Sequence, residues 1–317
     1  MKRTMFRRFL IALLLTLSPL ALQAQDGWPR RIDTATGPLD LAAPPQRIVS
    51  TSPSLTGTLL AVGAPVIATA AAMRGPLTDD QGFFRQWADI AEARDVAVLY
   101  PELGFDIEAV ILQDPDLVVV SETGGDSVLP FVPELRAMGF PVLVLNYGVN
   151  SWEDLARTLG RVTGQEAQAD RVITDFTDRA RAAGQRITHP EGTVSIVSYN
   201  FFGTYGVAKP EAAQARVLAE MGFTVAGLPE AMRGAVQASR EFDFVSHENL
   251  SAAITGDTIF LLAADEADVQ AVLDDPVLAT LPAVQARQVY PLGPTSFRVD
   301  YYSGQEIVDT VAAAFAE

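Results

Sequence analysis

FDIEAVILQDPDLVVVSE, residues 105–122, predicts a short helix, an aspartate-containing turn and a strand that is apolar on both faces. The stretch FVSHENLSAAITGDTIFLLA, residues 244–263, has the same order of features about 140 residues later. Helices and strands alternate along most of the chain, which favours a parallel or mostly parallel sheet. We therefore expect an α/β fold with two lobes of related architecture.

The sequence between the two copies has a different character. Ser151 and Asp154 resemble a helix capping box, and a first helix is expected to end near Gly164. Residues 165–187 then contain one glycine, Gly184, and no proline, with apolar residues at helical spacing. At about 1.5 Å per residue this segment could extend for roughly 30 Å, about the diameter of a small domain. Such a helix could connect two lobes rigidly, but this segment taken alone favours an ordinary packed helix.

These features divide the chain into four parts. A length of 317 residues is sufficient for two lobes. The expected parts are a signal peptide, residues 1–24; an N-terminal α/β lobe, residues 25–150; a connecting helical segment, residues 151–188; and a C-terminal α/β lobe, residues 189–317.

The first residues predict a secretory signal peptide. Basic residues between Lys2 and Arg8 precede the apolar run 9–17, which is too short to cross a bilayer as a helix. The small residue Ala24 fits a cleavage site. We expect a soluble chain exported to the periplasm, and not a lipoprotein, because the sequence has no cysteine to carry a lipid.

The composition excludes several classes of function. The formal net charge is −16, whereas a nucleic-acid-binding protein needs a basic surface, so no nucleic-acid partner is expected. The chain contains no cysteine, which excludes disulfides, thiolate metal sites and cysteine nucleophiles. Its two histidines, His189 and His247, are too few to favour a multi-histidine zinc or iron site.

The sequence lacks the motifs of common enzyme classes. It contains no G-x-S-x-G, Walker A or G-x-G-x-x-G pattern. His247 and Glu248 begin a pattern like that of zinc proteases, but Ser251 stands where the second histidine is required. The glycine-rich loop SETGGDS, residues 121–127, could present backbone N–H groups to an anion. We do not expect an enzyme.

The chain resembles the periplasmic receptors for ferric catecholate siderophores. The resemblance rests on PQRIVSTSPSLTGTLLAVGAPVIA, DDQGFFRQWADIA, PDLVVVSETGGDS, KPEAAQARVLAEMGF, HENLSAA and TSFRVDYYS. These receptors belong to the siderophore, haem and cobalamin branch of ABC-transporter substrate-binding proteins. The resemblance implies two α/β lobes joined by a single long helix, with the ligand in the interlobe cleft.

The resemblance also implies a ligand of the ferric enterobactin type, an iron(III) tris-catecholate with three negative charges and aromatic faces. Its iron is fully coordinated by the catecholates, so we expect no cofactor and no metal ligand from the protein; iron enters only as part of the bound ferric siderophore. By the same resemblance Arg74, Arg240 and Arg298 are ligand-binding residues. Arginine suits this role because its guanidinium is always charged and donates several hydrogen bonds.

One position departs from the family pattern. Where the family has a tryptophan just before the helix that begins in PEAAQ, this chain has Ala208. Phe201, Phe202 and Tyr205 lie just upstream, and Tyr205 and Phe202 are the expected aromatic ligand-binding residues. These aromatic residues fit a core position equally well, and the identity of the siderophore stays open.

The resemblance implies a partner as well. Family members present one glutamate per lobe to arginine pockets on the two subunits of an ABC permease in the inner membrane. Glu108 and Glu248 occupy matching places in the two helix–turn–strand copies. A glutamate early in a helix is also favourable through the helix dipole alone. We expect a monomer that delivers the siderophore to this permease dimer.

Two other functions stay open. A haem or cobalamin receptor of the same branch predicts a cleft lined by aromatic or histidine residues, with fewer arginines. An exported α/β hydrolase predicts a serine–histidine pair, and neither histidine stands in a motif that supports one.

Overall fold

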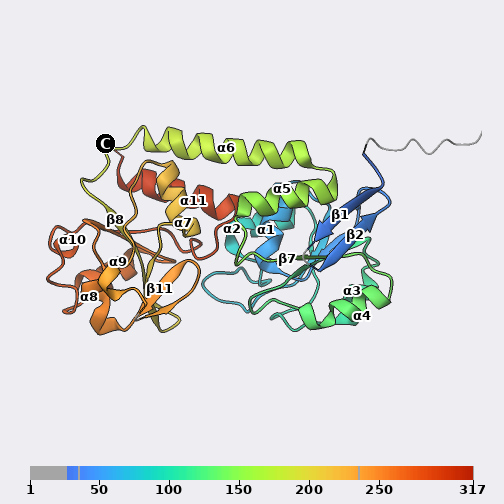
Figure 1. Cartoon of the computed structure of the whole chain (residues 1–317), viewed down its shortest axis with the longest axis horizontal. Helices are drawn as coiled ribbons and strands as arrows, with labels where there is room; N and C mark the ends of the chain where they lie inside the picture. The colour runs from blue at the N-terminus through green and yellow to red at the C-terminus, as the bar shows by residue number, and fades with distance from the viewer. Residues whose placement is uncertain (1–26, 35, 235, 317) are drawn as a thin grey trace, which may run out of the picture.

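The computed structural model describes residues 27–34, 36–234 and 236–316. It has two α/β lobes side by side, and the helix α6 (Glu166–Gly184) lies along one edge of both (Figure 1). The predicted signal peptide, residues 1–24, lies outside the described residues. Among the helices that are described, none is long and apolar enough to cross a membrane.

The N-terminal lobe is built on a parallel sheet with the strand order β5-β4-β3-β6-β7. Its strands are β3 (Ile48–Ser50), β4 (Val66–Thr69), β5 (Ala97–Val98), β6 (Leu117–Ser121) and β7 (Val142–Leu145). Every residue of β6 is buried, as expected for a parallel strand that is covered on both faces. An antiparallel hairpin precedes the sheet and consists of β1 (Arg30–Thr34) and β2 (Gly37–Leu41).

Helices cover both faces of this sheet. They are α1 (Pro53–Ala61), α2 (Arg85–Ala93), α3 (Ile107–Leu112), the 3-10 helix η1 (Leu129–Phe131), α4 (Val132–Ala137) and α5 (Trp152–Thr163). Alternate residues of β6 point to opposite faces. Val119 belongs to a hydrophobic cluster with Leu55 of α1 and Leu155 of α5, whereas Val118 belongs to another with Val110 of α3.

The C-terminal lobe has a mixed sheet with the strand order β10-β11-β9-β8-β12-β13. Its strands are β8 (Val194–Phe201), β9 (Thr204–Ala208), β10 (Gln237–Ala238), β11 (Phe242–Val245), β12 (Thr258–Leu261) and β13 (Val289–Pro291). The pairs β8–β12 and β12–β13 are parallel, as the sequence predicted. The pairs β8–β9, β9–β11 and β10–β11 are antiparallel, an extension that the sequence analysis did not anticipate.

The remaining helices surround this second sheet. They are α7 (Ala213–Glu220), α8 (Leu250–Ala253), α9 (Glu266–Leu273), α10 (Pro282–Gln285) and α11 (Tyr301–Ala314). Two 3-10 helices lie between them, η2 (Glu230–Met232) and η3 (His247–Asn249).

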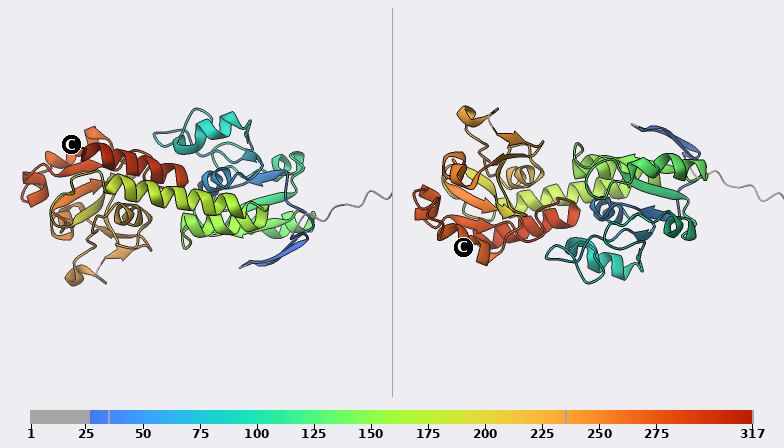
Figure 2. Two further views of the ribbon diagram at one scale, coloured as in Figure 1. Left: turned by 90° about the horizontal axis from the view of Figure 1, so that it is seen from above. Right: turned by 90° about the horizontal axis from the view of Figure 1, so that it is seen from below.

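Helices α6 and α11 hold the two lobes together. Helix α6 packs against α5 of the N-terminal lobe and against α7 and α11 of the C-terminal lobe. Helix α11 runs beside α6 (Figure 2) and also packs against α1 and α2. One hydrophobic cluster therefore extends through both lobes, from Leu55 and Trp87 through Phe176 and Val308 to Phe260. This arrangement confirms the expected two-lobed α/β fold with a long connecting helix.

Local signals separate α5 from α6. The Ser151 side chain accepts a hydrogen bond from the backbone N–H of Asp154 at 3.1 Å and caps α5. Gly164 ends α5 with φ at +74°, a left-handed conformation that glycine adopts without strain. The chain turns there, and α6 begins at Glu166 and reaches the second lobe.

Candidate functional site

Side chains of the two lobes meet at a small interlobe cavity of about 40 Å³. Ser54, Tyr147 and Trp152 line it from the N-terminal lobe, and Gln214 and Arg298 line it from the C-terminal lobe. Tyr147 follows β7 and Arg298 follows β13, so the cavity lies beyond the carboxyl ends of strands, where α/β sheets commonly bind ligands. A ligand of tris-catecholate size does not fit inside this volume, so it would have to lie at the open side or separate the lobes.

The guanidinium of Arg298 lies against two aromatic rings. Its central carbon is 4.7 Å from the ring centroid of Tyr147 and 4.7 Å from that of Phe297. Such contacts contribute about 0.5–2 kcal/mol each, depending on desolvation. Within the part of the chain that the structure describes, the guanidinium N–H groups have no hydrogen-bond acceptor. The backbone carbonyl of Arg298 accepts a hydrogen bond from Ser303 Oγ. The half-buried cation is therefore held in place with its donors available to an anion.

Aromatic rings continue outward from Arg298. The ring centroids of Phe297 and Phe201 are 4.7 Å apart, and those of Phe201 and Phe202 are 4.5 Å apart. Phe202 is 81% exposed, which is unusual for a phenylalanine that serves only the core. Phe202 is thus connected to Arg298 through the rings of Phe201 and Phe297.

The turn between β8 and β9 positions Phe202. Asn200, Phe202 and Gly203 all have positive φ, at 52°, 50° and 76°. Thr204 Oγ1 donates a hydrogen bond to the carbonyl of Phe201 at 2.6 Å and closes the turn. A left-handed conformation is unfavourable for phenylalanine, and such strain is typical of functional sites.

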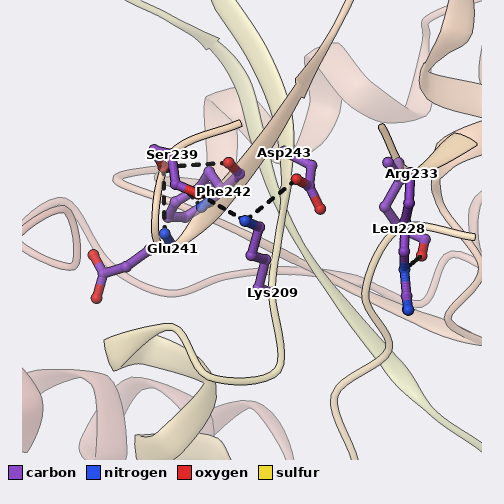
Figure 3. A network of polar contacts seen from close by, with 7 residues as sticks. All are labelled: Lys209, Leu228, Arg233, Ser239, Glu241, Phe242 and Asp243. Atoms are coloured by element: carbon purple, nitrogen blue, oxygen red, sulfur yellow. Dashed lines mark hydrogen bonds and ion pairs between the residues drawn. The ribbon is translucent and has the colours of Figure 1, made fainter. Parts of the chain in front are cut away.

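Arg240 lies on the turn between β10 and β11. Lys209 contacts Ser239 of that turn and Asp243 of β11 (Figure 3). The Nζ atom of Lys209 donates to the Ser239 carbonyl at 2.7 Å and lies 3.5 Å from a carboxylate oxygen of Asp243. The backbone N–H of Lys209 donates to the carbonyl of Glu241 at 2.8 Å. The turn that carries Arg240 is therefore fixed at both of its ends.

The three predicted arginines occupy different positions. The Arg240 Nη1 atom donates to the backbone carbonyl of Val149, so it crosses from the C-terminal to the N-terminal lobe. Arg74 is exposed on the loop that continues to Leu77, and Leu77 lines a small hollow together with Arg298. The structure thus places Arg240 and Arg298 between the lobes and Arg74 on the adjoining loop.

Tyr205 has different neighbours from those of Phe202. Its ring centroid is 4.9 Å from that of His247 and 5.4 Å from that of Tyr199. Asp275 accepts from Tyr199 at 2.8 Å and lies 2.5 Å from His247 Nε2. Burial alone raises the pKa of Asp275, but the hydrogen bonds from His247, the Val277 backbone and Tyr199 outweigh it and hold that pKa below its usual value. The structure does not bring Tyr205 into contact with the rings around Arg298.

The two predicted docking glutamates are both exposed. Glu108 lies in the first turn of α3, whose N-cap Asp106 accepts from the backbone N–H groups of Glu108 and Ala109. Glu248 lies in η3, directly before α8. Helices α3 and α8 are on the side of the molecule opposite α6, at the outer ends of the two lobes (Figure 1).

Tyr147 and Phe297 are the residues that sequence reasoning missed. Phe297 precedes Arg298 in TSFRVDYYS, so an aromatic neighbour for the arginine could have been found there. Tyr147 is about 150 residues away from Arg298 in the sequence, and no local pattern marks the contact.

Comparison with known proteins places the chain in a family. Residues 48–295 match the periplasmic binding protein family. The chain is 40% identical over 316 residues, 98% of each chain, to the ferric enterobactin-binding periplasmic protein FepB of Escherichia coli O6:H1 strain CFT073. The crystal structure of holo-ViuP matches with a TM-score of 0.82 and 37% identity, over 92% of this chain and 96% of that one.

A more distant structure shares the fold alone. The FhuD protein from S. pseudintermedius matches with a TM-score of 0.67 and 18% identity, over 89% of this chain and 96% of that one. The resemblance inferred from the sequence is confirmed by these matches. The chain belongs to the periplasmic binding protein family.

Proposed function

We propose that this protein is the substrate-binding protein of an ABC importer and captures a ferric catecholate siderophore of the enterobactin type between its lobes. The observation that carries the proposal is Arg298, a cation held between aromatic rings with its N–H donors available. FepB, which is named as a ferric enterobactin-binding protein, supports this choice of ligand.

The chemistry of the site suits an aromatic anion. Arg298 and Arg240 offer charge-assisted hydrogen bonds, each worth about 1.5–3 kcal/mol when well aligned. Phe201, Phe202 and Phe297 offer ring faces beside these cations. The net charge of −16 opposes a trianion only weakly, because surface charges are screened over about 8 Å at physiological salt.

The iron is cargo in this proposal. A tris-catecholate already supplies all the ligands of its iron, so the protein contacts the outside of the complex through cations and rings. The family consists of binding proteins rather than enzymes, and we assign no catalytic step to the chain.

Delivery requires a partner in the inner membrane. We assign to Glu108 and Glu248 the docking of the monomeric protein on an ABC permease dimer, one glutamate to each subunit. Individual exposed ion pairs contribute only about 0–1 kcal/mol. Two ion pairs held at a fixed spacing by α6 set the orientation of the protein on the permease. This is the role that we propose for Glu108 and Glu248 in the periplasm.

A fluorescence titration tests the ligand class. Trp152 lines the interlobe cavity, so a bound ferric catecholate should quench tryptophan emission of the purified protein. We expect saturable quenching by ferric enterobactin, with hemin, cobalamin and ferrichrome as controls. Saturable binding of one of the controls, with no response to ferric enterobactin, would contradict the assigned ligand while keeping a two-lobed receptor.

A further inference from the structure

Tyr147 extends from the N-terminal lobe to the cleft, and its ring and its hydroxyl make separate contacts. The ring contacts Arg298, whereas the hydroxyl donates a hydrogen bond to Asp126 Oδ1 at 2.7 Å. Asp126 is only 6% exposed, and its Oδ2 atom accepts from Ser52 Oγ and from the backbone N–H of Ser54. Because both oxygens of this carboxylate have donors, its orientation is fixed, and so is the hydroxyl that it holds.

The glycine-rich loop, residues 121–127, makes room for that hydroxyl. A Cβ atom on Gly124, whose φ is +86°, would lie 1.6 Å from the Tyr147 hydroxyl and 2.9 Å from Asp126 Oδ1. A Cβ atom on the next residue, Gly125, would meet nothing within 4 Å. The sequence suggested that this loop could receive an anion, but in the structure it receives the hydroxyl of Tyr147.

The hydroxyl of Tyr147 is a stable donor in this environment. Burial, together with the neighbouring Asp126 carboxylate, raises the pKa of Tyr147 to about 12, although the charge of Arg298 acts in the opposite direction. The phenol therefore stays protonated at neutral pH and keeps its hydrogen bond to Asp126.

We propose that Tyr147, held by Asp126 and accommodated by Gly124, is a positioning residue of the ligand site that orients the Arg298 guanidinium and contacts the anionic ligand from the N-terminal lobe. The inference rests on the proposed function and assigns to that site a residue from the N-terminal lobe. A free arginine side chain loses rotamer entropy when it is fixed, and an arginine already held by a ring has less of it to lose on binding. Tyr147 also faces the ligand from the lobe opposite Phe297 and Phe201.

Substitutions of Tyr147 and of two adjacent glycines provide the main test. Tyr147→Ala is expected to weaken binding of ferric enterobactin about 3- to 30-fold, the effect of losing one cation–π contact. Gly124→Ala is expected to weaken it in the same direction, because the new methyl group displaces the tyrosine. Gly125→Ala is the matched control and should bind as the unchanged protein does.

A second pair of variants isolates the hydroxyl. Tyr147→Phe keeps the ring and removes the hydrogen bond to Asp126. Tyr199→Phe removes an equivalent hydrogen bond, from a tyrosine to the buried Asp275 at 2.8 Å, in the C-terminal lobe. Both changes should lower the unfolding temperature by a similar amount, but only Tyr147→Phe should weaken ligand binding.

A double-mutant cycle tests whether Asp126 acts through the tyrosine. Asp126→Asn as a single substitution should weaken the binding of ferric enterobactin. Added to Tyr147→Phe, it should have no further effect on that binding. An equal loss in both backgrounds would overturn the positioning role of Asp126, because a merely structural contribution adds independently.

The outcomes separate this inference from the proposed function. If the unchanged protein does not bind ferric enterobactin, the proposed function fails. If it binds, and folded Tyr147→Ala and Tyr147→Phe bind equally tightly, the proposed function stands and the role of Tyr147 is overturned. Thermal unfolding of each variant establishes that it is folded. If an alanine variant does not fold, the double-mutant cycle of Tyr147→Phe and Asp126→Asn decides whether Tyr147 has the proposed role.

Discussion

The carboxylate of Asp300 lies directly against Gly57: a Cβ atom on Gly57 would stand 2.2 Å from Asp300 Oδ2. Asp300 caps α11 and accepts from the backbone N–H groups of Tyr302 and Ser303 at 2.9 and 3.0 Å. Gly57 lies within α1 of the N-terminal lobe. The first turn of α11 is thus packed against the opposite lobe, and the packing depends on a residue that has no side chain.

Gly57→Ala should destabilise the protein, although alanine in a helix is normally about 1 kcal/mol better than glycine. The methyl group would collide with Asp300 and would also lie 2.8 Å from Trp87 Cδ1. We expect a loss of about 1–3 kcal/mol in the free energy of unfolding, measured in urea, which is typical of overpacking. Gly75→Ala, in open surroundings, is the control. Equal stability of Gly57→Ala and the unchanged protein would contradict the close packing.

Asp300 makes stability depend on pH. Burial raises the pKa of Asp300 from its ordinary value of 3.8 to about 6, against the effect of its hydrogen bonds from Ser303, Tyr302 and Gln86. The folded state therefore favours the protonated carboxyl. The contribution of the protonated Asp300 carboxyl to stability is complete below about pH 4 and is lost as the pH rises to about 6.

Asp300→Asn keeps the shape and removes this titration. Relative to the unchanged protein, we expect the variant to gain about 3 kcal/mol in the free energy of unfolding between pH 4 and pH 7, from a shift of roughly two pKa units. Urea unfolding at several pH values measures the difference. A difference that is constant across this range would refute the raised pKa.

Phe202→Ser should separate binding from stability. The ring is 81% exposed, so its removal should leave the unfolding temperature unchanged. Loss of an aromatic contact should weaken the binding of ferric enterobactin about 2- to 12-fold. Unchanged affinity, measured by fluorescence titration, would remove Phe202 from the ligand site.

The docking role proposed for Glu108 and Glu248 is tested in cells rather than in the binding assay. Glu108→Ala/Glu248→Ala should reduce growth on ferric enterobactin as the iron source, while the purified double variant binds the ligand normally. Glu92→Ala/Glu191→Ala removes two exposed charges elsewhere and should support normal growth. Normal growth of the Glu108→Ala/Glu248→Ala strain would rule out the docking role.

The sequence predicted those parts of the fold that depend on local patterns. The apolar run of β6 indicated a covered parallel strand, and the capping residue Ser151 with Gly164 marked the limits of α5. The long interval without proline predicted a long helix, which is α6, and the resemblance to a family supplied its role as the connection between the lobes. The antiparallel strands β9, β10 and β11 were not predicted, because their pairing depends on contacts between distant segments.

The proposed ligand site was only partly predictable for the same reason. Resemblance to a family supplied Arg298 and Arg240, which the structure places between the lobes. Tyr147 contacts Arg298 only because two lobes come together, and a glycine-rich loop that holds a tyrosine hydroxyl looks the same in sequence as one that binds an anion.

The most direct test of the ligand site is a titration of the unchanged protein and of Arg298→Ala with ferric enterobactin. Loss of charge-assisted hydrogen bonds from this guanidinium should weaken binding about 10- to 150-fold. Arg179→Ala, which removes an exposed arginine that is paired with Asp309 and does not line the interlobe cavity, should bind as the unchanged protein does. Equal affinity of Arg298→Ala and the unchanged protein would contradict the account.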